Sequence, residues 1–146
     1  MPLLAIDGEI SIPRTFTFDE LRSLPQQLTE PSALLGGRAI GGVRLAAALL
    51  RLGVKPWARY AIISARDGYR ANIPVEVAGD CLLVYAIGDQ ALPVALGGPV
   101  RLLARGLGRC ANVKDVETIS FAVEPAVIEH ACPHERARSR GATISP

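Results

Sequence analysis

Three short segments of this chain combine glycines with arginine or lysine. Glycines flank Arg38, a polar Asp-Gly-Tyr-Arg turn is expected at residues 67–70, and a glycine-rich loop with fixed cations occupies residues 97–114. Glycine lets a ligand approach backbone N–H groups closely, and Arg or Lys can hold its negative charge. These segments therefore favour the binding of a small anion. The predicted contact residues are Arg38, Tyr69, Arg70, Arg101, Gly106, Gly108 and Lys114.

Each of these residues also has a plain structural interpretation. Arg38, Arg101 and Lys114 could be solvated loop cations, and the glycines around them could simply make turns. For Asp67 and Gly68 we favour a tight turn, with Gly68 at positive φ and a half-buried aromatic ring after it. The sequence alone leaves both interpretations open for the cations.

Two further groups of residues could react or bind a metal. Cys110 lies close to Arg109 and Lys114, which would favour its thiolate, but we favour a small apolar filler. Three potential ligands for zinc or copper alternate near the end of the chain: His130, Cys132 and His134. No second cluster completes such a site, so we predict a solvated tail there and no metal site.

The totals restrict the class of protein. The 146 residues suit one ordinary domain, and an apolar content of 49% argues against disorder in its body. A net charge of +2 and an aromatic content of 5% argue against a nucleic-acid or membrane surface. The three cysteines are not spaced as a disulfide framework, and the first residues do not form a secretory signal. We expect a cytoplasmic protein, or a periplasmic one if a signal segment was removed.

The elements that must position these residues are short. We predict an α+β, strand-rich single domain at residues 1–123, followed by an extension or tail at residues 124–146. Strands are expected at residues 60–64, 82–87, 100–103 and 118–123, and two short strands around a turn at residues 3–12. Residues 82–87 lack polar alternation, so both faces of that strand should be covered, and the preceding Cys81 should lie in the core.

Two segments are predicted to be helical. Thr17 followed by Glu20 is a capping box, which predicts a short helix that ends before Pro25. The apolar pattern at residues 43–52 predicts a buried helix with Gly53 as its C-cap. Residues 26–42, between the two helices, are expected to be a loop.

Six motifs follow one another from residue 7 to about residue 123. They are D-G-E-I at residues 7–10, the helix at residues 15–25, G-V-R-L with L-L and G-V at residues 42–54, S-A-R-D-G-Y at residues 64–69, G-G-P-V-R-L at residues 97–102, and V-K at residues 113–114. Their order and spacing resemble the molybdopterin-binding domain of the sulfite oxidase type of oxidoreductase. This resemblance implies a strand-rich fold of that type and molybdopterin as the cofactor.

The chain also departs from the pattern of that family. The family carries a cysteine ligand to molybdenum in the segment that corresponds to residues 26–42, and this segment contains no cysteine here. Leu96 or Ala95 replaces the family's histidine, Arg105 its proline, and Asp115 its tryptophan. The family's second, immunoglobulin-like dimerisation domain has no counterpart. The resemblance therefore implies a binding domain without the usual cysteine-ligated molybdenum.

Three functions stay open at this point. The first is a small domain that binds molybdopterin or another anionic ligand. The second is an active molybdenum oxidoreductase without a protein thiolate, in which cations such as Arg38 and Arg101 would bind the substrate. The third is a cofactor-free interaction or structural module with a protein partner. We expect the first.

Overall fold

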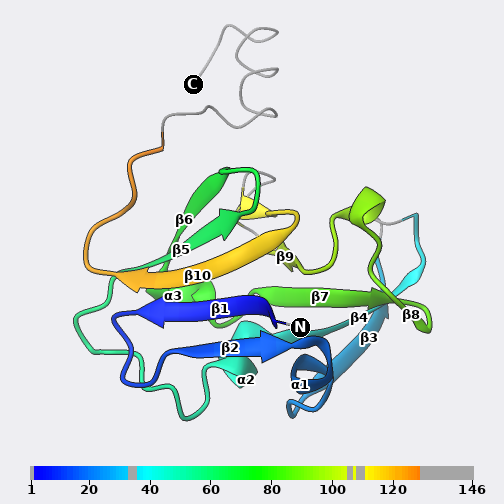
Figure 1. Ribbon diagram of the computed structural model, residues 1–146, viewed down its shortest axis with the longest axis horizontal. Helices are drawn as coiled ribbons and strands as arrows, with labels where there is room; N and C mark the ends of the chain where they lie inside the picture. Colours follow the sequence, from blue (N-terminus) through cyan, green and yellow to red (C-terminus); the bar gives the residue numbers. More distant parts are fainter. Residues whose placement is uncertain (1, 33–35, 105–106, 108–110, 129–146) are drawn as a thin grey trace, which may run out of the picture.

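The computed structural model describes residues 2–32, 36–104, 107 and 111–128, which form two five-stranded sheets (Figure 1). The first sheet has the strand order β2-β1-β10-β5-β6. Its strands are Pro2–Gly8 (β1), Arg14–Thr17 (β2), Tyr60–Ala65 (β5), Arg70–Pro74 (β6) and Val116–Ala122 (β10). β1 and β10 pair in parallel, and the other neighbours are antiparallel, so the sheet is mixed.

The second sheet is antiparallel throughout. Its path is β3-β4-β7-β8, and β9 also pairs with β7, at the end of that strand away from β8. Its strands are Gln27–Pro31 (β3), Ala39–Arg44 (β4), Leu82–Ile87 (β7), Gln90–Ala91 (β8) and Arg101–Leu103 (β9).

The named helices of the described residues are single turns between strands. They are α1 (Phe18–Arg22), α2 (Leu45–Ala48), α3 (Val75–Ala78) and the 3-10 helix η2 (Val94–Leu96). The predicted capping box is confirmed, because the Thr17 hydroxyl accepts from the Glu20 N–H at 3.1 Å and the Glu20 carboxylate accepts from the Thr17 N–H at 2.8 Å. None of the helices described is long and apolar enough to cross a bilayer.

One core cluster contains side chains of both sheets. Fully buried members include Ile6, Ile63 and Phe121 of the first sheet and Val43 and Leu83 of the second. A smaller cluster, with Leu82, Val84 and Ile87, lies on the other face of β7. The prediction that both faces of residues 82–87 are covered is therefore confirmed. Cys81 is in the core as expected, with 2% of its surface exposed.

The loop predicted at residues 26–42 is wrong. β3 and the first part of β4 occupy most of it and form a hairpin with Glu30 opposite Ile40. Gly41 and Gly42 serve pairing rather than a turn, since a Cβ atom on Gly42 would lie 2.6 Å from the carbonyl oxygen of Leu83 in β7. Glycine-rich sequence here marks close strand approach.

The helix predicted at residues 43–52 is mostly wrong. Val43 pairs with Leu83 as part of β4, and helix α2 covers only Leu45–Ala48 before the chain turns. Arg51 adopts a φ of +70° and Gly53 a φ of +71°, which no continuous helix allows. An apolar run cannot be assigned to helix or strand by its pattern alone, and here sheet pairing decides.

The remaining strand predictions agree with β5, β7, β9 and β10. Within residues 3–12 the first strand is confirmed as β1, but the second is reduced to an isolated bridge between Ile10 and Val54. Strands β2, β6 and β8 and helices α3 and η2 were not predicted, and β2 occupies the start of the segment at residues 15–25 that was expected to be helical. Of the predicted tail, residues 129–146 lie outside the described residues.

Candidate functional site

The predicted cations Arg101 and Lys114 meet at Gly97, and we call these three residues the Gly97 cluster. Gly97 ends η2 with a φ of +98°, which favours glycine. A Cβ atom on Gly97 would lie 2.9 Å from Cδ of Arg101 and 3.0 Å from Cγ of Lys114. The aliphatic stems of both cations therefore pack against the bare Cα of this glycine.

The neighbouring backbone also constrains the position of the Gly97 cluster. A Cβ atom on Gly98 would collide with the carbonyl of Leu92, so glycine is needed there for space. On the other side, the Leu102 N–H donates to the Val113 carbonyl at 2.8 Å and the Val116 N–H to the Val100 carbonyl at 2.8 Å. The cluster thus lies where the chain returns from β9 in the second sheet to β10 in the first.

Arg101 is a buried cation without an anionic partner among the described residues. Only 8% of its surface is exposed, and it forms no ion pair with a described carboxylate. One terminal nitrogen donates to the Leu96 carbonyl at 3.2 Å. Its Nε is the one buried side-chain nitrogen or oxygen without a hydrogen bond in the part of the chain that the structure describes. Burial lowers the pKa of Arg101 from its ordinary value.

Such an arrangement is costly unless an anion completes it. Burying a charge without a partner is strongly unfavourable, and a buried donor without an acceptor adds a further penalty. Lys114 is exposed, in contrast, and the stem of its side chain packs against the same glycine. One buried and one accessible cation side by side suit an anionic group that enters from solvent and reaches Arg101.

The β5–β6 turn joins the cluster through Asp115. The Arg66 Nε donates to the Asp115 carboxylate at 3.0 Å, and the Arg66 N–H donates to the Asp115 carbonyl at 3.1 Å. The turn itself is confirmed, since Gly68 has a φ of +96° and the Asp67 carboxylate accepts the Tyr69 N–H at 2.9 Å. Tyr69 is half-buried and packs against the main core.

Other predicted contact residues lie elsewhere. The Arg70 guanidinium donates to the Val127 carbonyl at 2.8 Å, so it holds the segment after β10. Arg38 is exposed at the β3–β4 hairpin, and the next residue, Ala39, accepts from Gly88 at 2.9 Å. Val84 of β7 pairs with Arg101, and Gly88 follows Val84 by four residues, which corresponds to about 13 Å of extended strand. Neither Arg38 nor Arg70 has a described contact with the Gly97 cluster.

Several predicted residues cannot be placed in this way. Gly106, Gly108 and Cys110 lie outside the described residues, as do the tail candidates His130, Cys132 and His134. Among the residues that are described, no group of three histidine, cysteine or acidic side chains could hold a metal. Burial, with the nearby Asp80, raises the pKa of Cys81 to about 11, so this thiol is a poor ligand.

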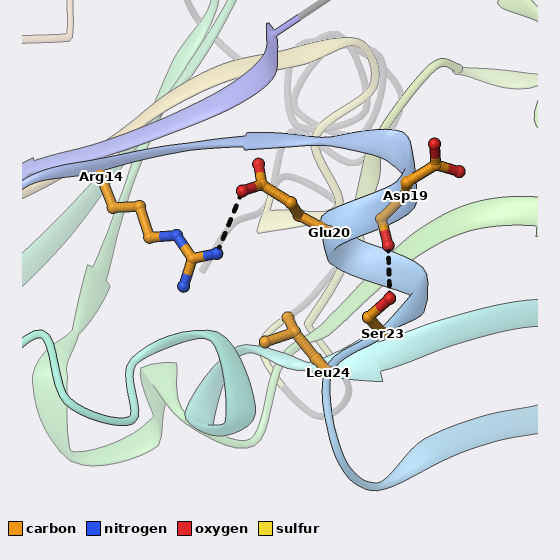
Figure 2. Close-up of a pocket in the computed structure, with 5 residues that line it drawn as sticks. All are labelled: Arg14, Asp19, Glu20, Ser23 and Leu24. Carbon is orange, nitrogen blue, oxygen red and sulfur yellow. Dashed lines mark hydrogen bonds and ion pairs between the residues drawn. The ribbon is translucent and has the colours of Figure 1, made fainter.

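A shallow hollow of about 260 Å³ lies elsewhere, between β2 and α1 (Figure 2). Figure 2 shows Arg14 directed at Glu20, at 3.3 Å, and the Ser23 hydroxyl donating to the Asp19 carbonyl at 2.8 Å. The Thr17 N–H and then Arg14 lower the pKa of Glu20. Arg14, Glu20 and Ser23 already have hydrogen-bond or ion-pair partners within the protein, so none of them requires a ligand in the hollow.

Sequence analysis missed Arg66 and Asp115 as residues that shape the site. Arg66 was seen only as part of a turn motif, and Asp115 only as a departure from a family pattern. Their opposite charges were the available signal, but they are 49 positions apart. Only the pairing of β5 with β10 brings them together.

Comparisons with known proteins agree with this fold. The family model described as the oxidoreductase molybdopterin binding domain matches residues 32–127. The crystal structure of the sulfane dehydrogenase SoxCD from Paracoccus pantotrophus is similar with a TM-score of 0.69 and 24% sequence identity over 83% of this chain. The match covers 38% of the SoxCD chain, so this chain spans well under half of that length. No curated protein matches. The chain therefore belongs to the oxidoreductase molybdopterin-binding domain family, with the strand-rich sulfite oxidase-type fold.

Proposed function

We propose that this domain binds a molybdopterin-type anionic ligand at the Gly97 cluster, without the cysteine-ligated molybdenum of its relatives. The single observation that carries the proposal is the state of Arg101, a buried guanidinium with an unpartnered Nε and no described carboxylate beside it. Membership of the molybdopterin-binding family supports the class of ligand.

The residues present fit the negative charge of such a ligand. Arg101 would donate from Nε to an anionic oxygen, and charge-assisted bonds of this kind are the strong ones. Lys114 would neutralise charge at the solvent side of the same glycine.

The residues fit a protein-bound molybdenum less well. Residues 26–42 contain no cysteine that could supply a thiolate. Among the described residues, no group of three histidine, cysteine or acidic side chains could hold a metal. A soft metal in a protein site requires such a donor or a comparable one. When bound, a molybdopterin would bring dithiolene sulfurs that can hold a metal by themselves, so an oxidoreductase without a protein thiolate is the alternative.

Expression in a host that makes molybdopterin tests the proposal. The pterin that co-purifies is oxidised to its fluorescent form and quantified, and molybdenum is measured on the same sample. We expect pterin near one per chain with molybdenum well below it. Arg101→Gln and Lys114→Gln should each lower the pterin content, while Arg44→Gln, an exposed arginine at the end of β4, should not.

The outcomes separate the three functions. Pterin and molybdenum in equal amounts would favour the oxidoreductase. Neither pterin nor molybdenum in protein from a competent host would reject ligand binding and favour a cofactor-free module.

A further inference from the structure

Asp115 holds an unusual backbone conformation at the entrance to β10. Its φ is +51°, in the left-handed region that is uncommon for residues other than glycine, although Asn and Asp adopt it more often than most. Such a conformation persists only where surrounding contacts maintain it. The contacts around Asp115 therefore indicate what the conformation is for.

These contacts join two segments that are far apart in the chain. The Asp115 N–H donates to the Gly97 carbonyl at 2.8 Å. Asp115 also accepts two hydrogen bonds from Arg66. The backbone N–H of Arg66 donates to the Asp115 carbonyl at 3.1 Å, and the Arg66 Nε donates to the Asp115 carboxylate at 3.0 Å. One residue thus links the Gly97 cluster to the β5–β6 turn.

Arg66 is itself held by further contacts. One terminal nitrogen lies 3.5 Å from the Glu117 carboxylate, and the other donates to the Leu3 carbonyl at 3.5 Å. The guanidinium is therefore anchored to both β1 and β10, which pair in parallel. Its position is set by the first sheet rather than by the loop that it holds.

The consequence falls on Lys114, which immediately precedes Asp115. Its stem packs at Gly97, and the backbone on either side is fixed, because Val113 accepts from Leu102 and Asp115 donates to Gly97. We infer that Arg66 and Asp115 are positioning residues: their ion pair fixes Lys114 beside Arg101, so the β5–β6 turn sets the spacing of the two cations. The effect on ligand affinity rests on the proposed function, whereas the positioning does not.

The ion pair can be removed with little effect on folding. The side chains of Arg66 and Asp115 are 40% and 33% exposed, and exposed ion pairs contribute little to stability. Arg14 and Glu20 offer a matched control, since they form an ion pair at 3.3 Å with exposures of 41% and 43%. Arg66→Gln and Arg14→Gln thus each remove one positive charge from a partly exposed ion pair, and Arg66→Gln also removes the contacts with Glu117 and Leu3.

The first measurement uses protein loaded with pterin in the competent host. Pterin loss is followed during dialysis, and thermal unfolding confirms that each variant is folded. Arg66→Gln should lose pterin about tenfold faster than the unaltered protein, as expected when one charge-assisted hydrogen bond is lost. Arg14→Gln should be unchanged. Equal rates in the two variants would overturn the inference.

The second measurement needs no ligand. Hydrogen exchange of the Asp115 amide and acetylation of Lys114 are measured by NMR and mass spectrometry. In Arg66→Gln the amide should exchange at least tenfold faster and the labelling rate of Lys114 should change, with neither effect in Arg14→Gln. Unchanged exchange and labelling in Arg66→Gln would also overturn the inference.

A second variant addresses the role of charge. Asp115→Asn keeps a residue that tolerates positive φ and one acceptor oxygen, so it should give an intermediate effect. Combined with Arg66→Gln, it should add little, because residues that act as a pair are not additive. Fully additive effects would contradict the pairing. If the unaltered protein retains no pterin, the proposed function fails, and the exchange and labelling data still decide this inference.

Discussion

Replacing Arg101 by methionine should stabilise the ligand-free domain while abolishing ligand binding. Methionine keeps an unbranched, flexible apolar stem, which can fill the space along Gly97 where Cδ of Arg101 lies. It removes the buried guanidinium, its unpartnered Nε and its single described hydrogen bond to Leu96. The two properties should therefore change in opposite directions.

The magnitude follows from these contacts. The lost hydrogen bond to Leu96, at 3.2 Å, contributes about 1.5 kcal/mol, the low end of the range for a charged donor. Removing an unsatisfied buried donor recovers about 1–3 kcal/mol, and removing a desolvated charge without a partner adds to this gain. We expect a net increase in the free energy of unfolding of about 1–2 kcal/mol. For a domain of this size, that corresponds to a rise in Tm of roughly 3–6 °C.

Calorimetry on protein from a host that makes no molybdopterin measures the stability. Arg44→Met, which removes the same charge from an exposed position, serves as the control and should leave Tm nearly unchanged. Pterin content after expression in the competent host measures binding. A ligand-free Arg101→Met protein that unfolds at a clearly lower Tm would show that the protein itself satisfies this guanidinium. The argument that Arg101 needs an external anion would then be refuted.

Three further predictions concern the surroundings of the site and the core. Gly97→Ala should destabilise the domain by about 1–3 kcal/mol in denaturant unfolding and reduce its pterin content, because the φ of +98° and the contact with Arg101 both oppose a Cβ atom. A variant as stable as the unaltered protein would mean that the stems of the two cations move aside at little cost. Thr17→Ala should lower the free energy of unfolding by about 1 kcal/mol through loss of the capping box, with no change in pterin content, and an unchanged midpoint would contradict the capping geometry. The Cys81 thiol should resist alkylation at pH 8, because burial raises its pKa from 9.0 to about 11. The stability that comes from the protonated Cys81 thiol should be fully present below pH 9 and be lost as the pH rises to 11, because the thiol of the unfolded chain releases its proton first. A Cys81→Ala protein whose free energy of unfolding shows the same pH dependence over this range would refute the assignment.

Local patterns in the sequence were sufficient where a few neighbouring residues decide the structure. The capping box needs only Thr17 and Glu20, whose contacts close within one helical turn, and it is formed as predicted. The turn at Gly68 depends likewise on its own φ and on the side chain of Asp67. The continuous apolar run of β7 predicted a strand with two covered faces because nothing polar interrupts it.

Prediction failed where distant pairing decides the structure. Val43 has the apolar spacing of a helix, but its partners Gln27 and Leu83 place it in a strand. Gly42 lies in a glycine-rich segment that is typical of a loop, but the carbonyl of Leu83 lies too close to its Cα for any side chain. Sheet hydrogen bonds connect residues far apart in the chain, so no local window contains the information.

The same division applies to the candidate site. The sequence by itself determined which residue types were available, namely Arg101 and Lys114 near glycines, and through the order of its motifs it indicated the family. Only the tertiary structure decided that these cations share Gly97, that Arg101 is buried with no described carboxylate as partner, and that Arg66 reaches Asp115. The physical reason is that burial and charge pairing depend on which distant strands become neighbours, and a chain acquires those properties only when its sheets assemble.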